Sequence, residues 1–277
     1  MNFFEAIILG LVQGLTEFLP ISSSAHLRIV GEFLPSHVDP GATFTAITQI
    51  GTELAVLVFF AGKIGRIIKQ WFLALIGKVP RNDPDARMGW LVILGSIPIC
   101  ILGFTLQEYI RDVFRNLWLV AAVLIVFGII LGVVDRMASR ARAMDDVTYP
   151  HGLTIGVAQA LALVPGVSRS GATTTAARAL GYNRVAAAEF AFLLAVPAVM
   201  GSGLYELQHG LEEGGAGPYG WGGVIAATVV AGIVGWVVIA YLMRYLKRGS
   251  FLPFVIYRVV LGGVVMVLLG AGVLSPL

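Results

Sequence analysis

The stretch EFLPISSSAHLR, residues 17–28, contains the groups needed to break a phosphate ester or anhydride. If the chain becomes helical after Pro20, Ser23 and His26 are three residues apart and share one helix face. A hydroxyl beside an imidazole is a pairing of nucleophile and general base. Two assignments stay open: Ser23 attacks with help from His26, or His26 attacks directly and Ser23 orients the phosphate.

A second pair of polar side chains precedes this stretch. Gln13 and Glu17 are four residues apart, so they also share a helix face. Oxygen ligands of this kind suit a hard divalent cation, Mg²⁺ or Ca²⁺, that bridges phosphate oxygens. The sequence therefore predicts a metal site at Glu17 and Gln13.

A third polar cluster is PGVSRSGATTT, residues 165–175, which places hydroxyls on either side of one guanidinium. A helix is expected to start immediately after it, and free N–H groups at a helix N-terminus bind anions. The guanidinium of Arg169 adds a planar fork that matches phosphate oxygens. The flanking hydroxyls are those of Ser168 and Ser170, and the ligand that this cluster predicts is a phosphate or pyrophosphate.

Structural roles compete with these assignments. The serines at 22–24 can cap a helix after a proline break, and His26 can be a core histidine with satisfied hydrogen bonds. Arg169 can be a structural partner of Glu17 or Glu189. Glu189 and Glu53 lie in apolar runs and are expected to be structural or to support the site. The joint arrangement favours chemistry more than any one residue does.

The composition indicates that all of these polar groups lie in an integral membrane protein. Of the 277 residues, 57% are hydrophobic and 13% are charged, whereas soluble domains have about 45–50% apolar and about 25% charged residues. The net charge of +3 is too small to indicate a nucleic-acid-binding protein. Apolar runs recur along the whole chain, which predicts one membrane domain over residues 1–277.

Six apolar runs are long enough to cross a bilayer, which takes about 20 residues. They are residues 41–61, 88–107, 116–135, 186–206, 220–243 and 252–275. Two further apolar stretches, residues 1–31 and 151–181, are broken by proline and hydroxyl side chains. Each of these two is expected to form a pair of short half-helices.

The Lys and Arg residues predict the orientation of the spans. Thirteen lie in residues 62–87, 136–150, 182–185 and 244–250, whereas the alternate loops at 1–40, 108–115 and 207–218 carry three. The positive-inside rule places the thirteen in the cytoplasm. Each broken stretch must then enter and leave on the same side, so both are predicted to be re-entrant, from opposite faces. Irregular backbone at membrane depth needs protein or a water-filled cavity around it, so the two tips are expected to meet.

An internal repeat supports this arrangement. A shift of 146 residues aligns LGLVQGLTEFLPISSSA, from Leu9, with IGVAQALALVPGVSRSG, from Ile155. The predicted fold is an all-α polytopic membrane protein with six spanning helices and two re-entrant broken-helix pairs in an inverted-topology repeat. The first repeat covers approximately residues 1–135 and the second approximately residues 151–275.

Two motifs resemble those of the BacA-type undecaprenyl-diphosphate phosphatases. QGLTEFLPISSSAH, residues 13–26, resembles the (E/Q)xxxE segment with its serine-rich turn and histidine, and PGVSRSGATTT resembles the PGxSRSxxT segment. AEFAFLLAVPAVMG, residues 188–201, continues the likeness, and length and hydropathy fit over essentially the whole chain.

The resemblance implies an enzyme of the bacterial inner membrane that hydrolyses undecaprenyl diphosphate to the monophosphate, recycles the carrier lipid for cell-wall synthesis and confers bacitracin resistance. It implies a divalent-metal-dependent site open to the periplasmic face. Carried over by motif, the catalytic residues are Ser23, His26, Glu17 and Arg169, with Gln13 and Glu17 in the acidic motif. The motif also implies the phosphate-binding residues, which are Ser168, Arg169, Ser170 and Thr173. Gln13 leaves Glu17 as the one anionic ligand there, so substrate pyrophosphate is expected to supply most of the metal's oxygens.

A lipid-phosphate flippase or transporter is the competing interpretation, because secondary transporters also use inverted repeats with broken midplane helices. Phosphate binding alone needs no nucleophile and base, so Ser23 beside His26 favours an enzyme. The expected partners are the polyprenyl diphosphate substrate and membrane lipids, without nucleic acid. Whether the chain also forms a homodimer stays open.

Overall fold

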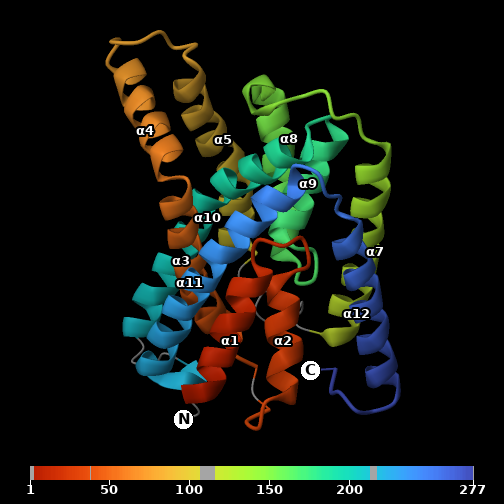
Figure 1. Ribbon diagram of the computed structural model, residues 1–277. Coiled ribbons are helices and arrows are strands. Elements are labelled where there is room, and N and C mark those ends of the chain that lie inside the picture. The colour runs from red at the N-terminus through yellow and green to blue at the C-terminus, as the bar shows by residue number, and fades with distance from the viewer. Residues whose placement is uncertain (1–2, 38, 107–115, 213–216, 277) are drawn as a thin grey trace.

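The computed structural model describes residues 3–37, 39–106, 116–212 and 217–276 (Figure 1). The secondary structure over these ranges is helical, apart from one isolated β-bridge between Arg142 and Tyr182. The predicted loop at 108–115 lies outside the described residues. The all-α fold class predicted from the sequence is confirmed.

Six helices are long and apolar enough to span a membrane, as predicted. Their centres coincide with the six apolar runs of the sequence, and most of their ends differ from those runs by a few residues. The protein is therefore a multi-pass membrane protein. The six are α3 (Gly41–Phe59), α5 (Pro84–Thr105), α7 (Leu117–Met137), α10 (Arg184–Glu212), α11 (Gly220–Leu246) and α12 (Leu252–Gly270).

Shorter helices complete the described chain. Helix α4 (Ala61–Leu75) follows α3 after one residue and packs beside α5, where the rings of Trp71 and Trp90 lie 5.4 Å apart (Figure 1). The two broken stretches form α1 (Phe3–Thr16) with α2 (Ser23–Phe33), and α8 (Tyr149–Ala160) with α9 (Arg169–Ala179). Single 3₁₀ turns are η2 (Met144–Asp146), η3 (Leu161–Leu163) and η4 (Gly217–Tyr219).

The two breaks have the same local geometry. Helices α2 and α9 each begin after a serine with a positive φ angle, 73° at Ser22 and 72° at Ser168. Each serine hydroxyl accepts a hydrogen bond from the backbone N–H three residues on, that of Ala25 or Gly171, as an N-cap does. A positive φ is uncommon for residues other than glycine and often marks a functional site. The serine-cap interpretation is thus correct for Ser22, and Ser168 takes the equivalent N-cap position at α9, which was not predicted.

The tips of the two broken pairs contact each other. In Figure 1 the α1/α2 pair occupies the lower half of the molecule and the α8/α9 pair the upper half. The hydroxyl of Ser170 donates a hydrogen bond to the carbonyl of Leu19, at 3.1 Å. The predicted meeting of the tips is therefore present in the structure.

Equivalent packing of α1 and α8 is what the predicted inverted repeat requires. A Cβ on Gly10 would lie 2.5 Å from the carbonyl oxygen of Ala227 in α11, and one on Gly156 would lie 2.2 Å from that of Gly95 in α5. Small residues at these crossings allow the backbones to approach closely. The re-entrant placement in a bilayer and the repeat itself stay predictions.

A buried ionic cluster holds the far end of α9. Arg178, with no exposed surface, donates from Nε to Asp135 at 2.9 Å and from Nη1 to the carbonyl of Ser139 at 2.9 Å. Arg184 also pairs with Asp135, at 2.7 Å, and the N–H of Phe251 donates to the same carboxylate at 3.3 Å. The cluster joins α7, α9, α10 and the start of α12.

Candidate active site

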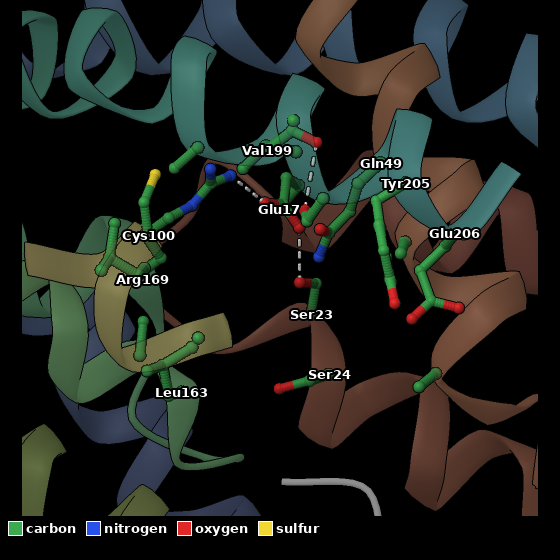
Figure 2. Close-up of a pocket in the computed structure, with 18 of the residues that line it drawn as sticks. Glu17, Ser23, Ser24, Gln49, Cys100, Leu163, Arg169, Val199, Tyr205 and Glu206 are labelled. Carbon is green, nitrogen blue, oxygen red and sulfur yellow. Dashed lines mark hydrogen bonds and ion pairs between the residues drawn. The ribbon is translucent and has the colours of Figure 1, made fainter. Parts of the chain in front are cut away.

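A cavity of about 450 Å³ opens where the two tips meet (Figure 2). Helices α3, α5 and α10 complete its walls. The helices that follow both tips begin here, and a helix N-terminus favours anions. The tip residues that line it are Glu17, Ser22, Ser23, Ser24, Ser168 and Arg169.

Glu17 is at the centre of the polar contacts. Its Oε1 pairs with the guanidinium of Arg169, so the ion pair joins the first tip to the second. Its Oε2 accepts hydrogen bonds from the hydroxyl of Ser23, at 2.5 Å, and from Nε2 of Gln13, at 2.7 Å. Figure 2 shows Glu17 between Arg169 and Ser23. The carboxylate thus contacts both Ser23, the nucleophile expected from the sequence, and Arg169, the guanidinium expected to bind phosphate.

Arg169 has a second carboxylate partner, Glu53, at 3.0 Å. Glu53 has no exposed surface, whereas the Arg169 side chain is 14% exposed and lines the cavity. The structural alternative that pairs Arg169 with Glu17 is therefore present, and Glu53 takes the place expected of Glu189. Glu189 instead pairs with Lys63, at 2.7 Å. Arg169 is held by two carboxylates and still faces the space a phosphate would occupy.

Ser23 and His26 are not hydrogen-bonded to each other in the described structure, unlike the pair expected from their spacing. His26 bonds through Nδ1 to the carbonyl of Ser22, at 2.7 Å, and through Nε2 to the hydroxyl of Tyr257, at 2.8 Å. Its ring stacks on that of Tyr257, with centroids 5.5 Å apart. These contacts direct the imidazole toward α12. The proton acceptor that contacts Ser23 is instead Glu17.

The four residues predicted to bind phosphate divide into two groups. Ser168 and Arg169 line the cavity. Ser170 bonds instead to the carbonyl of Leu19, and Thr173 is fully buried with its hydroxyl donating to the carbonyl of Arg169 at 2.7 Å. Ser170 and Thr173 therefore stabilise the tip that presents Ser168 and Arg169.

The predicted metal site contains oxygen donors but few carboxylates. No group of three or more His, Cys, Asp or Glu side chains arranged for a metal ion occurs in the described part of the chain. Among the described atoms, Oε1 of Gln13 and Oε2 of Glu53 are buried without a hydrogen-bond partner. Both belong to side chains that contact Glu17 or its partner Arg169. The site fits a hard cation that takes most of its oxygens from phosphate.

Several cavity residues were not identified from the sequence. Gln49, Tyr205 and Glu206 face the cavity from α3 and α10 (Figure 2), and Thr43 donates a 2.7 Å hydrogen bond to Glu206. Gln49 and Glu206 are polar residues within or at the end of apolar runs, the signal that marks function in membrane proteins.

Part of the cavity lining is apolar. It comes from α5, η3 and α10, through Ile99, Cys100, Phe104, Leu163 and Val199. A lining that combines apolar side chains with the polar groups of the tips suits an amphiphilic ligand.

Comparisons with known proteins show the family of the chain. The family model for bacitracin resistance protein BacA matches residues 6–264. The chain belongs to the BacA family. Similar proteins named undecaprenyl-diphosphatase occur in Clavibacter michiganensis subsp. michiganensis, 63% identical, and in Micrococcus luteus, 59% identical; each match covers 99% of this chain and 100% of the relative. A protein named undecaprenyl-diphosphatase 2 in Streptomyces coelicolor is 52% identical over 100% of this chain and 98% of its own length.

Proposed function

We propose that this BacA-family protein removes the terminal phosphate of undecaprenyl diphosphate and leaves undecaprenyl phosphate and inorganic phosphate. The relatives that match it over nearly their full lengths are named for this activity. The observation that carries the proposal is the contact of Glu17 with both Ser23 and Arg169 in one cavity.

Ser23 is the proposed nucleophile. Its oxygen attacks the terminal phosphorus, the bond from that phosphorus to the bridging oxygen breaks, and undecaprenyl phosphate leaves. The serine proton passes to Glu17, which already accepts its hydrogen bond at 2.5 Å. Water then hydrolyses the phosphoserine. In this proposal His26 contributes by holding the first turn of α2 through the Ser22 carbonyl.

Arg169 stabilises the charge on the transferred phosphoryl group, together with Ser168 and the N–H groups at the start of α9. When Glu17 takes up the proton of Ser23, its attraction for Arg169 weakens. The guanidinium is then available to the phosphate oxygens, so proton transfer and phosphate binding support each other.

The proposed cofactor is a divalent cation, Mg²⁺ or Ca²⁺, and the side chains of Glu17 and Gln13 would be its protein ligands. When bound, it would neutralise charge on the diphosphate oxygens. The protein's own groups orient the phosphate and accept the serine proton.

The proposed location is the bacterial inner membrane, with the cavity open toward the outer face. The distribution of Lys and Arg supports this orientation, because thirteen of the 19 lie in residues 62–87, 136–150, 182–185 and 244–250, which the positive-inside rule places in the cytoplasm. An enzyme so placed recycles the carrier lipid for cell-wall synthesis, and competes with bacitracin for the diphosphate.

The test is metal-dependent release of inorganic phosphate from undecaprenyl diphosphate by the purified protein in detergent. A lipid flippase would release none, because it moves the lipid between two sides of a membrane and breaks no bond to phosphorus. Glu17→Ala and Arg169→Ala are expected to abolish release. Glu189→Ala is the matched control, since Glu189 is an apolar-run carboxylate whose partner is Lys63. Undiminished release by both Glu17→Ala and Arg169→Ala would contradict the assignment of the site.

A further inference from the structure

Arg258 lies in the middle of α12, and it has no exposed surface. Every hydrogen bond that its guanidinium makes within the described residues goes to a main-chain carbonyl oxygen. A buried cation is costly unless its donors are satisfied. An arginine in such a place needs a reason beyond packing.

The carbonyls that Arg258 binds belong to both tips. Nη1 donates to Pro20 of the first tip at 3.1 Å, and Nη2 donates to Gly166 and Val167 of the second tip, at 2.9 and 3.1 Å. A further bond, from Nε to Leu124 at 3.2 Å, fixes the guanidinium to α7. One planar group therefore joins the two segments whose side chains form the cavity.

The bonds to Arg258 also orient the second tip. A trans peptide points its C=O and N–H in opposite directions. Because the carbonyl of Val167 points at Arg258, the N–H of Ser168 points away from it. Ser168 lines the cavity, whereas Arg258 is not among the described residues of its wall. Arg258, outside the cavity wall, thus sets the direction of the Ser168 N–H of the second tip.

We infer that Arg258 is a positioning residue for phosphoryl transfer: it holds the tips in the register at which Ser23 faces a phosphate bound by Arg169. The inference rests on the function proposed above. Its physical basis is that a displacement of about 1 Å in a reacting group can lower a rate on the order of 100-fold.

The first test replaces the guanidinium while keeping its charge. Lysine in Arg258→Lys retains a buried cation but lacks the planar fork that reaches both tips. Arg178→Lys is the matched control, because Arg178 is as buried and also binds carbonyls, but at the other end of α9. Phosphate release from undecaprenyl diphosphate, thermal unfolding and hydrogen–deuterium exchange are measured on all three proteins.

For Arg258→Lys we expect kcat to fall on the order of 100-fold while KM changes less than about threefold, since the lost interaction acts on the transition state. Exchange of the backbone amides in residues 17–22 and 164–170 is expected to rise in both segments together. Arg178→Lys is expected to lower the unfolding temperature without either effect. Equal loss of kcat in the two variants, or unchanged exchange at the tips of Arg258→Lys, would overturn the inference.

A gentler variant covers the case in which Arg258→Lys does not fold. A Cβ on Gly171 would lie 3.0 Å from Nη1 of Arg258 and 3.1 Å from Cβ of Ser168, so Gly171→Ala displaces the guanidinium and crowds the second tip without removing the arginine. Gly263→Ala is its control, because a Cβ there meets no described atom within 4 Å. Gly171→Ala is expected to lower kcat and raise exchange at both tips, and no change in either would overturn the inference. Absence of phosphate release by the wild-type protein would count against the proposed function alone, since the exchange measurement tests the bridge independently.

Discussion

The hydroxyl of Ser23 lies 2.5 Å from Oε2 of Glu17, and the other oxygen of the same carboxylate pairs with Arg169. Ser23 and Glu17 belong to the first tip, whereas Arg169 is 152 residues further along the chain and belongs to the second. The carboxylate therefore connects a nucleophile on one segment to an anion clamp on another.

Ser23→Ala is expected to lower kcat on the order of a thousandfold or more, because it removes the attacking oxygen. Ser24→Ala is the matched control. Ser24 lines the same cavity, but its hydroxyl lies 3.2 Å from that of Ser22 and is assigned no role in proton transfer. Steady-state phosphate release measures both. A Ser23→Ala protein as active as Ser24→Ala would exclude Ser23 as the nucleophile.

Glu17→Gln keeps the size of the side chain but removes the proton acceptor and the charge. Loss of a general base lowers rates by about 10²–10⁴-fold, and we expect kcat to fall within that range. Glu53→Gln is expected to lower kcat less and to change mainly KM. The reason is that Glu53 is fully buried and contacts Arg169 but not Ser23. Comparing kcat and KM of the two variants checks this; a larger fall in kcat for Glu53→Gln would reverse the two roles.

Tyr257→Phe tests the position of His26. It removes the phenol that bonds to Nε2 of His26 but keeps the ring that stacks on the imidazole. A neutral hydrogen bond contributes about 1 kcal/mol, so activity is expected to fall less than about tenfold. If His26 were the nucleophile, freeing its Nε2 would change kcat far more, and phosphate release by Tyr257→Phe and His26→Gln would show it.

Gly156→Ala and Gly10→Ala test the close crossings of the two short pairs. The added methyl would meet a backbone oxygen at 2.2 Å in the first case and at 2.5 Å in the second. Overpacking of this kind costs about 1–3 kcal/mol of stability, so both variants are expected to unfold at lower temperature. Gly62→Ala adds a methyl in open space and serves as the control. The unfolding temperature of each variant is measured in detergent at matched protein concentration. Equal unfolding temperatures for the three variants would contradict the close packing at Gly156 and Gly10.

The helices followed from local pattern, and the meeting of the tips followed from the distribution of Lys and Arg along the chain. Apolar runs, proline breaks and the serines at 22 and 168 are visible in the sequence, and each has a direct structural result. Partners distant along the chain were not predictable in this way. Spacing brought Ser23 and His26 to one helix, but Tyr257, 231 residues from His26, decides where the imidazole points.

The partners of Arg258 were also not predictable from the sequence, although the residue itself was conspicuous. A single arginine inside the last apolar run was a visible signal, because charges at membrane depth mark function. Its partners are carbonyls of Pro20, Gly166 and Val167, which carry no side-chain signature that a sequence pattern could pair with it. Thr173 is the converse case, since its motif position suggested phosphate binding, whereas its hydroxyl donates to the carbonyl of Arg169 one turn earlier in its own helix.

The most direct test of the central claim is to locate the phosphate on the enzyme during turnover. The protein is mixed with undecaprenyl diphosphate radiolabelled in its terminal phosphate, quenched in acid and digested, and the labelled peptide is identified. If Ser23 is the nucleophile, an acid-stable label appears on Ser23 and is absent from Ser23→Ala. An acid-labile label on His26 would contradict this assignment.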